Sequence, residues 1–246
     1  MYIPAHFAAD AAAVDELLRH HGAADLVTVT PEGLVATLLP FIYVPPAELA
    51  AAGSDTGGSA TSGSATGGSA TGGSATGGSA GAGPGQAGSL GALHGHLARN
   101  NPQWKLGSAG EALVIVRGPD AYISPGWYAA KAEHGRVVPT WNYVTAQVYG
   151  RLVVHDDPAW TEDLVRRLTV KHEAYREYPW SVDDAPRPYI EGQLRAIVGV
   201  ELEITRIEAK AKLSQNRPAA DIDGVTAGLR ERGDAASADA VARARR

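Results

Sequence analysis

Apolar and polar residues alternate over much of this chain, which is the pattern of β-strands with one buried face. Six runs show it: Leu26–Thr30, Leu34–Val44, Leu90–Ala98, Ala112–Val116, Asn142–Val154 and Val200–Leu213. The first two flank Pro31-Glu32-Gly33, a tight-turn sequence, so we predict that they form a hairpin. In the last run the alternation slips at Ile207, which predicts a β-bulge. Gly118-Pro119-Asp120, after the fourth run, predicts a turn.

Other parts of the chain have the 3.6-residue period of helices. Asp10 is suited to cap a helix that runs to His21. Two further helices are predicted later in the chain, one from Leu164 to His172 and one from Tyr189 to Val198. A hairpin, several strands, two helices and a return strand together indicate an α+β fold with a closed antiparallel sheet.

A low-complexity segment interrupts this pattern. Gly53–Ser89 consists largely of Gly, Ser, Ala and Thr in short repeats, and Asp55 is its only charged residue. Such a segment buries too little apolar surface to offset the entropy lost on ordering, so we predict a disordered loop insertion. We expect one domain over residues 1–217, interrupted by this insertion, and a helical or frayed tail over residues 218–246.

Composition narrows the classes of site and partner. The chain has no cysteine, which excludes disulfides and thiolate metal sites, and its net charge of −5 gives no general attraction to nucleic acid or anionic membranes. No apolar run approaches the length of a membrane span, and the first residues lack the basic and apolar regions of a signal peptide. We therefore expect a soluble cytoplasmic protein.

Two polar-aromatic clusters carry the candidate chemistry, Tyr122–Tyr128 and Pro139–Tyr143. Buried polar atoms need hydrogen-bond partners, so a packed core has little use for this mixture. The clusters and the residues between them offer hydroxyls, stacking faces and cations: Ser124 and Thr140, Trp127 and Trp141, Lys131 and Arg136. Together they suit a flat, polar, phosphorylated ligand such as a flavin. The alternative is that the two tryptophans only plug the end of a barrel.

Two smaller groups of polar residues are also candidates. His94 and His96 lie on one face of a predicted strand, where they can bind a metal or haem or serve only as hydrogen-bonded structural residues. Arg99 can bind a phosphate or form a surface salt bridge. Lys210–Arg217 is a polar cluster at the end of the last strand, and its alternative interpretation is a solvated strand edge.

Five blocks of this chain, in order, resemble the PaiB family of FMN-binding negative transcriptional regulators. They are Met1–Pro4, Gly95–Trp104, Tyr122–Tyr128, Val137–Tyr143 and Lys212–Pro218. The resemblance implies a split β-barrel like that of the pyridoxamine-phosphate oxidases, with peripheral helices, and a homodimer that binds FMN at the subunit interface. The cofactor-binding residues that it implies are His96, Arg99, Asn100, Ser124, Trp127, Lys131, Thr140, Trp141, Asn142, Lys212, Ser214 and Gln215.

Several functions stay open at this level. The chain also resembles piperazate synthases, haem enzymes that form an N–N bond, and His96 would then be the axial ligand. A flavin-dependent oxidoreductase and a small-molecule binding module without a cofactor are compatible with the same residues. No catalytic residue is assigned, and no metal site other than this haem ligand is expected. The acidic charge and the lack of a recognition-helix pattern argue against direct contact with DNA, so regulation is expected to be indirect.

Overall fold

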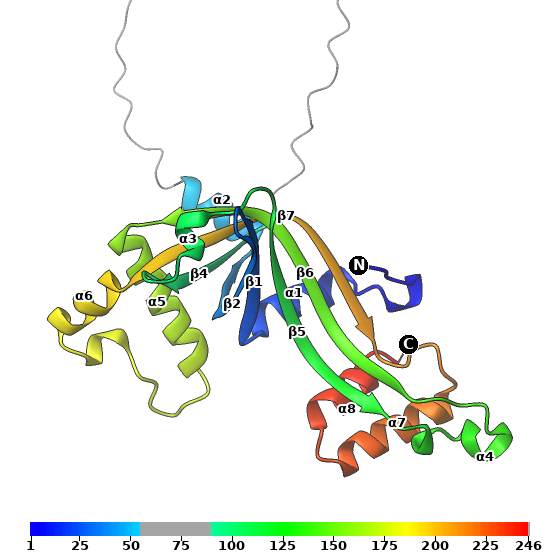
Figure 1. Ribbon diagram of the computed structural model, residues 1–246. Helices are drawn as coiled ribbons and strands as arrows, with labels where there is room; N and C mark the ends of the chain where they lie inside the picture. Colours follow the sequence, from blue (N-terminus) through cyan, green and yellow to red (C-terminus); the bar gives the residue numbers. More distant parts are fainter. Residues whose placement is uncertain (55–89, 246) are drawn as a thin grey trace, which may run out of the picture.

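The alternating runs form one sheet of seven antiparallel strands in the computed structural model, which describes residues 1–54 and 90–245 (Figure 1). The strands are β1 (Ala23–Thr30), β2 (Gly33–Pro40), β3 (Ile42–Val44), β4 (Ala92–Ala98), β5 (Ala112–Ile123), β6 (Thr140–His155) and β7 (Ile197–Lys212). Their order across the sheet is β2-β1-β5-β6-β7-β4-β3. The predicted α+β fold with an antiparallel sheet is confirmed.

Phe41 closes this sheet into a barrel. β2 and β3 stand at the two edges of the strand order, yet only Phe41 separates them in the sequence. Its side chain is fully buried, and a Cβ placed on Gly95 of β4 would lie 2.8 Å from its ring. The prediction of one strand over Leu34–Val44 is therefore wrong. Pro40 has no N–H to continue the ladder with β1, and after the bend β3 pairs with β4 instead.

Two bulges bend the long strands away from the barrel. In β5 the register shifts between Arg117 and Asp120, so the segment predicted as a turn is an irregularity inside a continuing strand. In β7 the predicted bulge is present but lies at Thr205 rather than Ile207. We call the parts of β5, β6 and β7 beyond these bulges, with residues 124–139 that join β5 to β6, the distal arm.

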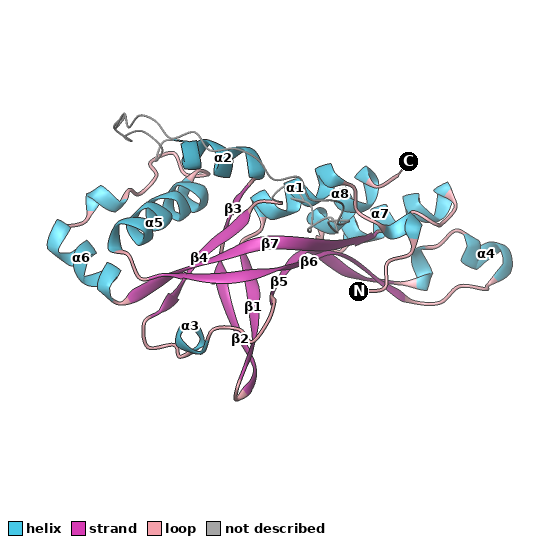
Figure 2. Ribbon diagram, turned by 90° about the horizontal axis from the view of Figure 1, so that it is seen from above, coloured by secondary structure: helices cyan, strands magenta, loops and turns pink. Residues whose placement is uncertain are grey.

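Helices surround the sheet. They are α1 (Ala11–His20), α2 (Pro46–Ser54), α3 (Gln103–Leu106), α4 (Ala130–His134), α5 (Pro158–Glu173), α6 (Arg187–Arg195), α7 (Ala219–Glu231) and α8 (Ala235–Arg243), with short 3₁₀ helices η1 (Ala5–Phe7), η2 (Pro125–Trp127) and η3 (Val182–Asp184). The predicted cap of α1 is confirmed, because the Asp10 side chain accepts a hydrogen bond from Ala13 N at 2.9 Å. Figure 2 shows α2, α5, α7 and α8 on one side of the long strands and the β1–β2 hairpin projecting on the other.

The predicted insertion and tail differ in how far the structure describes them. Residues 55–89 lie outside the described part of the chain, and Gly53 and Ser54 end α2. The tail forms α7 and α8, which share a hydrophobic core with Ile123 of the distal arm and with Leu213, the residue after β7. No helix in the described ranges is long and apolar enough to cross a membrane.

The buried His21 predicts a specific dependence of stability on pH. Its pKa is lowered to about 4, by burial and then by the nearby charge of Lys171. The neutral ring is the form that the fold favours, so its contribution is fully present above about pH 6.5 and is lost as the pH falls toward 4. We predict that the free energy of unfolding falls less steeply over this range in His21→Asn than in the wild type. Urea unfolding at several pH values measures this, and parallel profiles would assign the acid sensitivity to another group.

Candidate functional site

A pocket of about 220 Å³ opens in the distal arm, where β6 begins and β7 ends. Its lining residues are Phe7, Tyr128, Val138, Pro139, Thr140, Asn142, Lys212, Ser214, Asn216 and Arg217. Four of them, Thr140, Asn142, Lys212 and Ser214, are among the residues predicted to bind a cofactor. We call this the distal pocket.

The distal pocket carries two cations and no lining carboxylate. Lys212 Nζ donates hydrogen bonds to Thr140 Oγ1 and to the carbonyl oxygen of Trp141. The Arg217 guanidinium lies 4.7 Å from the centre of the Tyr128 ring. Within the described residues neither cation forms a salt bridge, so both charges are available to an anionic ligand.

Buried polar groups support the strand ends that form the pocket. Asn142 Nδ2 donates to Ser214 Oγ at 3.0 Å, and both side chains are buried. Ser214 has φ = 65°, the only positive φ among the described non-glycine residues. Gln215 fixes this turn by accepting from Leu213 N at 2.7 Å and donating to the Ala211 carbonyl oxygen. A left-handed serine costs on the order of 1–3 kcal/mol, and such strain is concentrated at functional positions.

Tyr128 and Asp221 are buried beside the distal pocket with polar atoms that have no partner among the described residues. The Tyr128 hydroxyl lies near Ser214 and Arg217 without an aligned hydrogen bond, and burial raises its pKa. Asp221 Oδ1 accepts from Ala130 N at 3.0 Å, whereas Oδ2 accepts nothing. Buried polar atoms are normally satisfied, so the open Tyr128 hydroxyl indicates a polar ligand or an ordered water in the pocket that it lines.

Other predicted residues of the distal arm have different surroundings. Ser124 caps η2 by accepting from Gly126 N at 3.1 Å. The Trp127 ring packs against α7, where a Cβ on Gly228 would lie 2.4 Å from it, rather than at the end of the barrel. Lys131 is exposed on α4. Trp141 is 51% exposed, and its Nε1 donates to Asp120 Oδ1 at 2.8 Å.

The remaining three predicted residues lie far from this pocket. His96 pairs with Gly199, near the start of β7, whereas Lys212 is at its end. At a strand rise of about 3.3 Å per residue the two lie up to roughly 40 Å apart. Asn100 is exposed in the turn that follows β4. A single chain therefore does not bring the twelve predicted residues into one site.

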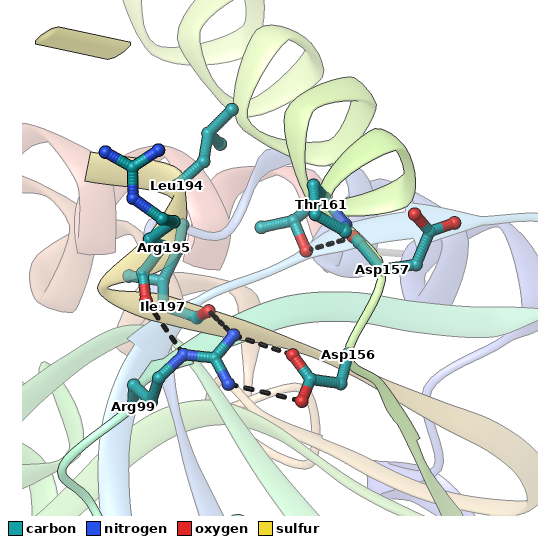
Figure 3. A pocket seen from close by; sticks show the side chains of 8 residues that line it. Arg99, Asp156, Asp157, Thr161, Leu194, Arg195 and Ile197 are labelled. Atoms are coloured by element: carbon teal, nitrogen blue, oxygen red, sulfur yellow. Dashed lines mark hydrogen bonds and ion pairs between the residues drawn. The ribbon is translucent and has the colours of Figure 1, made fainter. Parts of the chain in front are cut away.

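The Arg99 side chain donates hydrogen bonds to other residues of the same chain (Figure 3). It lines a second pocket, of about 260 Å³, near the start of α5. Its guanidinium donates to Asp156 at 2.6 Å and 3.2 Å, and to the carbonyl oxygens of Arg195 at 2.8 Å and Ile197 at 3.1 Å. The salt bridge that was the alternative for Arg99 is what the structure contains.

The two strand histidines also have separate surroundings. His94 lies 3.4 Å from Glu201, which accepts from His155 at 2.7 Å, and Trp160 stacks on His155. His94 Nε2 is buried and forms no hydrogen bond with the described residues at that distance, so the structural role that the sequence left open stays a prediction. His96 Nδ1 is buried without a partner among the described residues, and burial lowers the pKa of the ring. Residues 1–54 and 90–245 contain no cluster of three metal-ligating side chains.

Tyr128, Arg217 and Phe7 line the distal pocket but are not among the twelve predicted cofactor-binding residues. Tyr128 and Arg217 belong to the Tyr122–Tyr128 and Lys212–Pro218 blocks, which also contain predicted cofactor-binding residues. A hydroxyl and a guanidinium in these blocks could therefore have been predicted to bind the ligand. Phe7 comes from the N-terminal segment, which runs along β7 through a bridge between Ala8 and Lys210. No local pattern in the sequence indicates that approach.

Comparisons relate the chain to known proteins. A family model described as "Putative FMN-binding domain" matches residues 1–206. An uncharacterized protein of Emericella nidulans is 35% identical over 172 residues, which are 59% of this chain and 68% of that protein. The protease synthase and sporulation protein PAI 2 of Bacillus subtilis is 38% identical over 128 residues, 52% of this chain and 59% of that protein. The conserved hypothetical protein Rv2991 of Mycobacterium tuberculosis, a solved structure, is 9% identical with a TM-score of 0.49, over 89% of this chain and 94% of that one.

Proposed function

The chain belongs to the family described as "Putative FMN-binding domain", and from this premise we propose that it is an FMN-binding homodimer whose distal pocket holds the cofactor phosphate. The family match and the Bacillus subtilis relative confirm the resemblance that the sequence blocks indicated. The pocket residues from Lys212 onward lie beyond the matched region, so their role rests on geometry alone.

The chemistry of the distal pocket fits a phosphate. Lys212 and Arg217 supply two positive charges that no carboxylate neutralises within the described chain, and Thr140, Ser214 and Tyr128 supply hydroxyls. This set of donors carries the proposal, because ionised phosphate oxygens form the strongest hydrogen bonds with cationic donors. With about 220 Å³ the pocket is smaller than a typical ligand site, so the ring system of the cofactor extends beyond it.

The outer face of the sheet supports a homodimer. Leu34 and Leu38 of β2 are 75% and 65% exposed, and the register continues this face through Val27 of β1 to Leu113 of β5. The ion pair between Asp25 and Arg117 is the charged part of this face, and an exposed face with so many apolar residues commonly binds a partner. A two-fold axis that crosses the strands would also bring the His96 end of one chain to the Lys212 end of its partner, and so reunite the two halves of the predicted site.

FMN supplies redox chemistry when bound, and the chain's residues bind and orient it. Haem is the alternative. A metal-bound histidine usually donates its second ring N–H to a carboxylate or carbonyl, and His96 Nδ1 has no such partner among the described residues. This observation favours FMN over haem. The absorption spectrum of the purified protein tests the choice, because a Soret band that disappears in His96→Ala would overturn it.

We propose that any regulatory role is indirect. Arg230, Arg232 and Arg245 of the C-terminal tail each lie within ion-pair distance of an aspartate, which reduces the net positive charge that this part of the tail presents. Regulation through flavin chemistry or a protein partner needs no contact with DNA, so it is consistent with the net charge of −5. Tight, sequence-specific operator binding in a gel-shift assay at physiological salt would contradict this.

Lys212→Gln tests the phosphate assignment. We predict that this change weakens FMN binding about 10- to 100-fold, the effect of losing one charge-assisted contact, and leaves riboflavin binding nearly unchanged. Fluorescence titration with both ligands measures the ratio. Lys105→Gln, which removes the same charge from exposed α3, is the matched control and should alter neither affinity. Equal weakening of both ligands by Lys212→Gln would show that the phosphate lies elsewhere.

A further inference from the structure

Four exposed aromatic residues lie on the connection between α5 and α6, residues 174–186, and at the start of α6. Tyr178 is 81% exposed and Trp180 46%, and Tyr175 and Tyr189 are also exposed. None of them lines either of the two pockets described above. Several exposed aromatic residues on one segment mark a surface that binds a partner or a ligand.

Hydrogen bonds and an ion pair fix the backbone of this connection. Trp180 N donates to Glu173 Oε2 at 3.0 Å, which fixes the backbone at the tryptophan. Ser181 and Asp184 form a reciprocal capping box around η3. Arg166 of α5 binds Asp183 at 2.8 Å. These contacts fix the backbone that carries Trp180, so less backbone entropy is lost when its ring binds.

The distal arm has a complementary surface around its pocket. Trp141, Tyr122 and Val138 are exposed there, and the Trp141 and Tyr122 rings meet edge to face at 6.3 Å. Lys131, Glu133 and Arg136 give the loop between β5 and β6 a net charge of +1. The α5–α6 connection has three acidic residues and one arginine, and one of the acidic residues, Asp183, is paired with Arg166. The two surfaces therefore match in apolar character and oppose each other in charge.

The two surfaces lie at opposite ends of the molecule, with α5 and α6 at one end and α4 and α7 at the other (Figures 1 and 2). They cannot meet within one chain. In a closed two-fold dimer, any contact between them occurs twice, so both sets of aromatic residues and both distal pockets are covered at once. This dimer uses the same two-fold axis that brings the His96 end of one chain to the Lys212 end of its partner.

We infer that each distal pocket is completed by the partner subunit, whose Trp180 stacks on the ring of the ligand held there. This rests on the proposed FMN-binding dimer and adds the residue that contacts the flavin ring. Trp180 is the candidate because indole offers the largest stacking face and its backbone is fixed by Glu173. The distal pocket of one chain binds the phosphate, and Trp180 of the other chain covers the flavin ring.

Single variants separate the two contributions. Trp180→Ala is expected to weaken FMN and riboflavin alike, by about tenfold, because stacking acts on the shared ring. Lys212→Gln affects FMN only. Trp180→Phe restores most of the riboflavin affinity. Circular dichroism and sedimentation of each variant confirm folding and dimer formation. Unchanged riboflavin binding in a folded Trp180→Ala dimer would overturn the inference and leave the phosphate assignment intact.

A mixed dimer gives the decisive test. Co-expression of Trp180→Ala and Lys212→Gln chains with different tags allows the heterodimer to be purified. If each site takes its pocket from one chain and Trp180 from the other, one of its two sites has both defects and the other has none. At an FMN concentration that leaves both parent homodimers nearly empty, the heterodimer should bind about one FMN. Binding no higher than in the parents would show that Trp180 and Lys212 do not act across the interface. A wild-type protein that binds no FMN would instead refute the proposed function itself.

Discussion

Replacing Gln103 with leucine is expected to lower the free energy of unfolding by about 3–5 kcal/mol. Gln103 is fully buried, and its side chain joins α3 to the first two strands. Its Oε1 accepts from Thr37 Oγ1 at 2.6 Å, and its Nε2 lies within 3.3 Å of the Leu26 and Val35 carbonyl oxygens and of Thr28 Oγ1. Leucine fills the volume but leaves these buried groups without their partner, and each lost bond of this kind is costly.

Equilibrium urea unfolding measures this effect. Gln193→Leu is the matched control, because Gln193 is exposed on α6 and the same change there should stay within about 0.5 kcal/mol. If Gln103→Leu and Gln193→Leu had equal free energies of unfolding, the hydrogen bonds of Gln103 would not stabilise the barrel. A large loss would show that Gln103, which belongs to the Gly95–Trp104 block, stabilises the fold. Arg99 of the same block has a similar role, because its guanidinium hydrogen bonds to Asp156 and to the carbonyl oxygen of Arg195.

Gly224→Ala is expected to destabilise the protein by about 3 kcal/mol, although alanine is the better helix former. A Cβ on Gly224 of α7 would lie 2.0 Å from the carbonyl oxygen of Trp127. That oxygen belongs to the backbone, so no side-chain rotation relieves the overlap and α7 must move away from η2. The core that α7 and α8 share with the distal arm would then open.

Gly192→Ala is the control with the opposite sign. Gly192 lies inside α6, where a Cβ would meet only the Arg195 side chain at 3.8 Å. Helix propensity then acts alone, and a gain of about 0.5–1 kcal/mol is expected. Thermal unfolding of both variants tests the pair. A gain at both positions would mean that α7 does not pack against Trp127 as described.

Local patterns predicted most of the sheet and the helices α5 and α6, because strand alternation and helix period reflect burial directly. The second predicted helix extended to Val198, whereas α6 ends at Arg195 and Val198 belongs to β7. Local patterns failed where the outcome depends on distant residues. The bend at Phe41 follows from the pairing of β3 with β4, whose partner residues lie about fifty positions later. The packing role of Trp127 depends on two glycines of α7, almost a hundred residues away.

The candidate site was predicted in part for the same reason. The chemistry of the clusters indicated the residues around Thr140 and Lys212, and the pairing of Tyr143 with Lys212 brings those segments together. The sequence could not show that His96 and Arg99 lie at the other end of β7, because residue types carry no information on distance. Nor did it reveal that Arg99 is committed to Asp156, which follows it by 57 positions.

Closure of the barrel through Phe41 has a consequence for how the chain folds. The first 44 residues contain both edges of the sheet and β1, whereas the other strands that lie between those edges come from residues 92–212. The sheet therefore stays incomplete until β7 has left the ribosome, because β7 is the strand that joins β4 to β6. Folding is dominated by pairings between distant segments, which makes barrel closure a slow, late step that follows synthesis of nearly the whole chain.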